Sequence, residues 1–149
     1  MIIVRPWDND NIYELLPLLN QLGYPVTEQD LKRRLTTFLA QRGQGIAIAC
    51  HEKGSIVGLI AWSKSHLLLK DKVRYHIEAL VVDTHYRKQG IGQKLMQYLE
   101  SLALQGEPAI IDLTSGVRRA PEGTHDFYKR LGYHNEGAMA KIYLRKEIS

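Results

Sequence analysis

Apolar residues follow two different spacings along the chain, and the change between them marks the expected elements. After a short apolar strand at residues 2–5, leucines recur every three or four positions, which is the spacing of one face of a helix. This pattern predicts two amphipathic helices, and Pro17 is expected to kink or split the first of them. The two apolar stripes are Ile12, Leu15, Leu16, Leu19 and Leu22, followed by Leu31, Leu35, Phe38 and Leu39.

Short apolar runs dominate the middle of the chain and predict three strands, at residues 45–51, 56–65 and 75–82. The turn at residues 52–55 makes the first two an antiparallel hairpin. A helix, a strand at 109–114, a short helix at 126–131 and a last strand at 139–146 complete the pattern. The order β-α-α-β-β-β-α-β-α-β is typical of one mixed α/β domain over residues 1–149.

Composition narrows the class of protein but does not identify it. The 149 residues are 44% hydrophobic and 24% charged, which is ordinary for a globular chain. The single cysteine, Cys50, excludes an intramolecular disulfide and favours a reducing compartment. No secretory leader or membrane-length apolar run is visible, so we expect a cytoplasmic protein that does not enter a membrane.

The net charge of +4 raises the question of an anionic partner. The basic residues stand in short pairs and triplets rather than in one tract, which argues against nucleic acid and favours a small phosphorylated ligand. The six histidines have no metal-ligand spacing, so we expect no metal site.

A glycine-containing turn at residues 87–92 lies between an expected strand and an expected helix. The first N–H groups of a helix lack intrahelical partners and attract anions, and glycine lets a ligand approach the backbone. The turn lacks the spacing of a Walker loop and the third glycine of the dinucleotide fingerprint. On its own it is a weak signal, and the alternative is a purely structural connection without a ligand.

Two motifs together resemble the GNAT superfamily of N-acetyltransferases. The first is the apolar strand Ile77–Asp83 followed by Arg-x-x-Gly-x-Gly at 87–92, and the second is Phe-Tyr-Lys-Arg-Leu-Gly-Tyr at 127–133. They occur in family order, about forty residues apart. The resemblance implies an α/β GNAT fold: a mixed central sheet, antiparallel in its front half, with a parallel splayed pair at the cofactor slot, flanked by about four helices.

The resemblance also implies acetyl-CoA as the acetyl donor. In the family, the backbone of the glycine loop holds the pyrophosphate, and the pantetheine arm pairs with the backbone of the signature strand. The matching positions in this chain are Leu80, Val81 and Val82 on the strand, and Arg87, Lys88, Gln89, Gly90, Ile91, Gly92, Gln93 and Lys94 in the loop and first helical turn.

Two residues are candidates for proton transfer, one as a general base and one as a general acid. Glu78 is a carboxylate within an apolar run, and a desolvated carboxylate is a good general base. The alternative is a glutamate on a solvent-facing side, paired with Arg74 or Lys72. The family places a glutamate base here, and a tyrosine at the position of Tyr128 that protonates the leaving thiolate. Tyr128 has the alternative role of packing its short helix.

Weaker candidates surround these two. His76 lies two residues from Glu78 and is an alternative base or substrate contact. Thr114 and Ser115 either bind substrate or cofactor or satisfy the strand end; the family often has asparagine near here, and this chain does not. Tyr24 is a candidate for the wall of the acceptor pocket.

The implied reaction is direct attack of a primary amine, most simply a small molecule, on acetyl-CoA in a ternary complex. A protein N-terminal or lysine acetyltransferase and a non-catalytic acyl-CoA-binding module remain as alternatives. Many members of the family are homodimers, so a homodimer is expected from the resemblance alone.

Overall fold

The computed structural model describes residues 1–9, 11–52 and 54–149. By its contacts the chain divides into two compact units, Met1–Ile111 and Asp112–Ser149. Of the turn predicted at residues 52–55, Lys53 lies outside the described residues.

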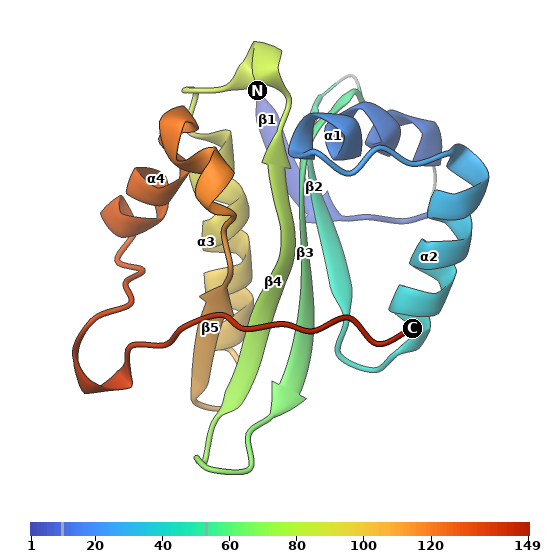
Figure 1. The fold of residues 1–149 in the computed structure, drawn as a ribbon. Coiled ribbons are helices and arrows are strands. Elements are labelled where there is room, and N and C mark those ends of the chain that lie inside the picture. The colour runs from blue at the N-terminus through green and yellow to red at the C-terminus, as the bar shows by residue number, and fades with distance from the viewer. Residues whose placement is uncertain (10, 53) are drawn as a thin grey trace. The chain divides into compact units, whose positions relative to one another are not determined.

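A five-stranded sheet organises the fold, in the spatial order β1-β2-β3-β4-β5 (Figure 1). The first four strands pair antiparallel, and β5 runs parallel to β4. This confirms the predicted mixed sheet with an antiparallel front half. The strands are β1 (Ile2–Pro6), β2 (Gly45–His51), β3 (Ile56–His66), β4 (Val73–Val82) and β5 (Ala109–Leu113).

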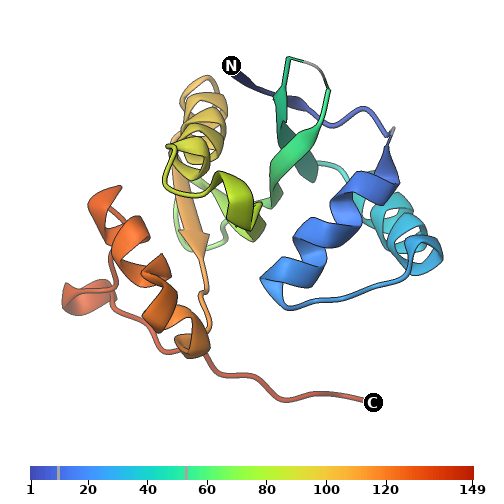
Figure 2. The same cartoon turned by 90° about the horizontal axis from the view of Figure 1, so that it is seen from above.

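Helices cover both faces of the sheet in the first unit. Figures 1 and 2 show α1 and α2 on one face and α3 on the other. The α-helices are α1 (Leu15–Leu22), α2 (Glu28–Ala40), α3 (Ile91–Leu104) and, in the second unit, α4 (Thr124–Arg130). Short 3₁₀ helices are η1 (Ile12–Glu14), η2 (Thr84–Tyr86), η3 (Val117–Glu122) and η4 (Gly137–Met139).

The first predicted helix is split, as expected, but ahead of Pro17 rather than at it. Residues 12–14 form η1, and the α-helix begins at Leu15, so Pro17 lies in its first turn. A proline is tolerated there because the N–H groups of the first turn have no intrahelical acceptor. The apolar stripe therefore continues across the break.

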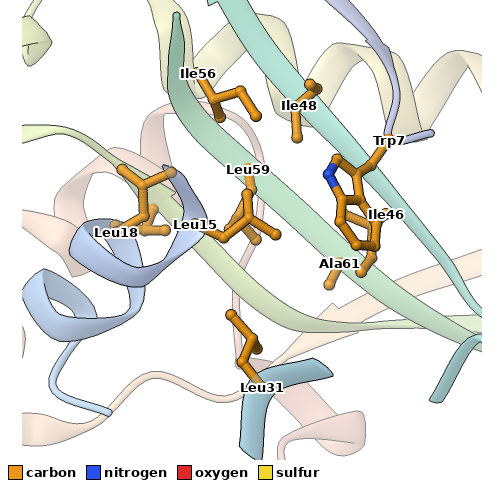
Figure 3. Packing of buried hydrophobic residues seen from close by; sticks show 10 residues of the cluster. Trp7, Leu15, Leu18, Leu31, Ile46, Ile48, Ile56, Leu59 and Ala61 are labelled. Atoms are coloured by element: carbon orange, nitrogen blue, oxygen red, sulfur yellow. The ribbon is translucent and has the colours of Figure 1, made fainter. Parts of the chain in front are cut away.

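The face under α1 and α2 carries a closely packed core. Leu15 and Leu18 of α1 meet Leu59 of β3, as Figure 3 shows, and both α1 leucines are only 1% exposed. Ala79 and Val81 of β4 pack with the same cluster. Burial of each leucine or valine stabilises the fold by about 1.5–3 kcal/mol, so this cluster holds α1 firmly over the second half of β4.

The predicted last strand at residues 139–146 is wrong. The segment begins at the last residue of η4 and continues without strand structure, and Ile142 and Leu144 are 83% and 84% exposed. Alternating side chains fit a strand, but a strand also requires a neighbour for its backbone hydrogen bonds, and alternation alone does not supply one.

Candidate functional site

A row of three polar side chains lies along β4. Arg74, His76 and Glu78 alternate with Val73, Tyr75 and Ile77, which are buried. The Nη2 atom of Arg74 lies 3.0 Å from Nδ1 of His76, and Nε2 of His76 lies 3.7 Å from Oε2 of Glu78. The structure thus brings His76 and Glu78 together, as their spacing predicted.

A β-bulge ends this row at Glu78. Ile77 is the partner of Trp62 and Ala79 is the partner of Ala61, so β4 has one residue more than β3 between these pairs. Trp62 and Ala61 are neighbours in β3 and point to opposite faces. Ile77 and Ala79 therefore also point to opposite faces although they are two residues apart, which is the phase shift that a bulge produces.

The bulge explains where Glu78 lies. The phase shift turns Ala79 into the core under α1, while the side chain of Glu78 stays 43% exposed beside His76. The expected burial of Glu78 among apolar residues is therefore wrong. The alternative prediction, a glutamate that faces solvent, agrees better with the structure. The ion-pair partner of Glu78 is His76, however, and not Arg74 or Lys72 as that alternative proposed.

Beyond Glu78, the strand runs into a turn that several hydrogen bonds hold. The N–H of Asp83 donates to the carbonyl of Val57 at 2.8 Å, and the Nε of Arg87 donates to the carbonyl of Val82 at 3.2 Å. From α1, the side-chain carbonyl of Gln21 accepts the N–H of Thr84 at 2.9 Å. These bonds fix the end of β4 relative to the start of α3.

The carboxylate of Asp83 is the central acceptor of this turn. It accepts the backbone N–H of His85 at 2.9 Å, and that hydrogen bond is the main reason why the pKa of Asp83 is lowered. Gln21 and Asp83 escaped the sequence reasoning. Gln21 lies in α1 off the leucine stripe, so the apolar pattern gave no signal for its role.

At the start of α3, the backbone is shaped for close approach. Gly90 is the N-cap residue with φ 78°, and Lys88, two residues earlier, has φ 61°. A glycine at the N-cap leaves the first helical N–H groups without a side-chain acceptor. Ile91 is 2% exposed and anchors the helix in the core.

The predicted cofactor residues lie along the connection from β4 to α3, and their side chains differ in exposure. Val81 and Ile91 are buried, and Leu80, Val82, Arg87 and Gly92 are partly buried. The polar positions face solvent: Lys88, Gln89, Gly90, Gln93 and Lys94. The first N–H groups of the helix, at its positive terminus and flanked by two exposed lysines, suit a phosphate or diphosphate.

In the second unit, Tyr128 lies on α4 in an aromatic cluster. Its ring centroid is 5.2 Å from that of Phe127 and 6.3 Å from that of Tyr133. Burial raises the pKa of Tyr128 to about 12, and the charge of Arg119 opposes this only in part. The phenol therefore keeps its proton at neutral pH, so its hydroxyl is chemically able to donate a hydrogen bond.

The remaining candidates have contrasting environments. The Oγ of Ser115 is buried and has no hydrogen-bond partner among the described residues, whereas Thr114 beside it is exposed. A buried hydroxyl without a partner is uncommon and consistent with a ligand contact. Tyr24 follows α1 and is 64% exposed.

The described residues contain neither a metal-binding cluster of side chains nor a helix that could span a membrane. Among residues 1–9, 11–52 and 54–149, no three or more His, Cys, Asp or Glu side chains gather in a way that could hold a metal ion. In that same part of the chain, every helix is too short or too polar to cross a membrane.

Comparison with known proteins places these features in a family. The sequence model of the acetyltransferase (GNAT) family matches residues 9–133. Among solved structures, a GNAT family acetyltransferase from Staphylococcus aureus is 27% identical, with a TM-score of 0.75 over 96% of this chain and 98% of that chain.

Two more distant structures share the fold. Glucosamine-6-phosphate N-acetyltransferase from Arabidopsis thaliana is 20% identical, with a TM-score of 0.73 over 97% of this chain and 99% of that chain. An aminoglycoside 6'-N-acetyltransferase from Acinetobacter baumannii is 19% identical, with a TM-score of 0.75 over the full length of both chains.

We predict that Asp83→Asn lowers the free energy of unfolding by about 1 kcal/mol at pH 7, because a neutral amide is a weaker acceptor than a carboxylate. A pKa lowered in the folded protein means that this stabilisation is present above the unfolded pKa and is lost as the pH falls through the folded value. The difference from the unmodified protein should therefore shrink below about pH 4.

Urea unfolding at pH 7 and at acid pH measures this difference. Asp71→Asn, at an exposed position in the β3–β4 loop, is the matched control and should leave the stability unchanged. Equal pH profiles for the two variants would contradict the role assigned to Asp83.

Proposed function

The chain belongs to the GNAT family of acetyltransferases, and from this premise we propose that it transfers the acetyl group of acetyl-CoA to a primary amine. The junction of β4 and α3 carries the proposal. Between Glu78 and the start of α3 it combines an exposed carboxylate, a strand end held by hydrogen bonds, and a helix N-terminus without a side-chain cap. These are the parts needed to remove a proton from an amine and to hold an anionic coenzyme.

The start of α3 is the proposed binding site for the diphosphate of the coenzyme. The N–H groups of Gly92 and its neighbours are the donors, and Lys88 and Lys94 add positive charge. The backbone of Leu80 to Val82 is proposed to pair with the pantetheine arm. When bound, acetyl-CoA supplies the activated thioester. Arg87 has a supporting role here, because its Nε already donates to the carbonyl of Val82.

Glu78 is the proposed proton acceptor. An alkylamine is protonated at neutral pH, since its pKa is about 10, and an ammonium has no lone pair with which to attack a carbonyl. A carboxylate that is 43% exposed is reachable by an amine or by a bridging water. Glu78 therefore accepts the proton directly or through water before the C–N bond forms.

Tyr128 is the proposed donor to the leaving sulfur. A thiol has an ordinary pKa of about 8.5, well below the value of about 12 for Tyr128. A phenol that weakly acidic stabilises the developing thiolate as a hydrogen-bond donor and keeps its own proton, and the sulfur takes up the second proton that the nitrogen loses as the amide forms. The high pKa keeps this donor intact across the whole range in which amines become deprotonated.

A small-molecule amine is the proposed acceptor, and the cytoplasm is the proposed compartment. A panel of small amines, with lysine peptides and peptides carrying a free N-terminus beside them, separates this acceptor class from the protein alternatives. We propose that the buried hydroxyl of Ser115 donates a hydrogen bond to the substrate or the cofactor, because it has no hydrogen-bond partner within the described chain.

Glu78→Gln tests the proposed base. We expect kcat for acetyl transfer to fall about 10²–10⁴-fold, with the dissociation constant of acetyl-CoA unchanged. Raising the pH should restore part of the rate, because the amine then loses its proton unaided. Release of free thiol from acetyl-CoA measures the rate, and calorimetry measures the affinity.

Glu107→Gln is the matched control for this variant. Glu107 is an exposed carboxylate whose Oε1 lies 3.6 Å from Nε2 of His66, so it has the same type of neighbour as Glu78. Its variant should keep the full rate. Equal rates for Glu78→Gln and the unmodified enzyme would remove Glu78 from the mechanism.

Tyr128→Phe tests the proposed donor. Removing the hydroxyl should lower kcat about 10²-fold without pH rescue, because deprotonating the amine does not help the thiolate to leave. The ring contacts to Phe127 and Tyr133 do not require the hydroxyl, so the melting temperature should stay close to that of the unmodified protein. A pH-dependent recovery like that of Glu78→Gln would argue against a role at the leaving group.

A further inference from the structure

We propose that His76 is a positioning residue for Glu78 and is not itself the base, because Arg74 holds the imidazole in the tautomer that presents an N–H to the Glu78 carboxylate. The inference rests on the proposed function for its catalytic consequence. Of the two candidate bases that the sequence left open, the proposal selects Glu78 over His76.

The chemistry of arginine sets the tautomer. A guanidinium carries only donors, so its Nη2 at 3.0 Å from Nδ1 of His76 makes that ring nitrogen the acceptor. In a neutral imidazole the hydrogen then stands on Nε2. The one lone pair of the ring that could take a proton from a substrate is thus occupied by Arg74.

The other ring nitrogen faces the carboxylate. Nε2 of His76 lies 3.7 Å from Oε2 of Glu78, longer than a hydrogen bond but within reach after a small side-chain rotation. His76 is 21% exposed and Glu78 is 43% exposed. The histidine is therefore the better enclosed partner, and the glutamate is the one with room to move.

The strand arrangement makes space for this row. In the register of β3 and β4, His76 lies opposite Ser63 and Arg74 lies opposite Ser65. Cross-strand neighbours on one face are close, and small side chains there leave room for an imidazole and a guanidinium to lie along the strand. The bulge then ends the row at Glu78 and sends Ala79 into the core.

Replacement of His76 by the two side-chain amides separates the roles of its two nitrogens. The amide nitrogen of glutamine reaches the position of Nε2, whereas that of asparagine reaches only the position of Nδ1. Neither amide is a base. We expect His76→Gln to keep kcat within about threefold, and His76→Asn and His76→Ala to lose about tenfold or more. The KM for acetyl-CoA should stay unchanged in all three.

His66→Gln is the control, because His66 pairs with Glu107 at an exposed position and should give the unmodified rate. If His76→Gln is as inactive as His76→Ala, an N–H at the position of Nε2 is not sufficient and the donor role is wrong.

A readout that needs no activity tests the tautomer itself. Long-range nitrogen–proton NMR of the free, full-length protein reports which ring nitrogen carries the hydrogen. We expect Nε2–H for His76 at neutral pH, and a larger share of Nδ1–H in Arg74→Met, which lacks the donor. An Nδ1–H ring in the unmodified protein would overturn the proposal. An Nε2–H ring without acetyl transfer to any amine would instead reject the proposed function.

Discussion

Between its pairings with Trp62 and Ala61, β4 holds one residue more than β3, and that residue is Glu78. Before Glu78, the polar side chains of Arg74 and His76 lie on one face of β4. After Glu78, Ala79 lies on that same face and packs into the core under α1. An uninterrupted alternation would have placed Ala79 on the α3 side and an acidic side chain against the leucines, at a cost of several kcal/mol. The bulge therefore allows one strand to be both a core strand and the carrier of a carboxylate.

β4 is followed by η2 and then by α3, so the bulge and the N-terminus of α3 lie on one continuous segment of the chain. Packing and hydrogen bonds hold this segment along its length. Ala79 and Val81 hold the strand in the core, Arg87 and Gln21 hold the turn, and Ile91 holds the helix. Binding groups placed on such an enclosed frame lose little freedom when a ligand arrives. This rigidity is the physical basis for proposing that the junction binds the coenzyme and that Glu78 acts beside it.

Much of this fold was accessible from the sequence because it follows from local periodicity. The leucine stripes of α1 and α2, the hairpin of β2 and β3, and the glycine turn before α3 lay where their patterns predicted. The bulge was not accessible, because the pairing of two strands decides it and the run after Glu78 is apolar at every position. The exposure of Glu78 followed from the bulge and was missed with it. The predicted strand at residues 139–146 was wrong for the converse reason. Its alternation is regular, but a strand also needs a neighbouring strand for its backbone hydrogen bonds.

The claim on which the account depends is that the N-terminus of α3 binds the diphosphate of acetyl-CoA. Amide NMR of the full chain during titration with acetyl-CoA tests it directly, with inorganic pyrophosphate as a competitor. The account predicts saturable shifts at the amides of residues 88–94 and reversal of those shifts by pyrophosphate. Binding that leaves these amides unmoved, or no binding at all, would contradict it.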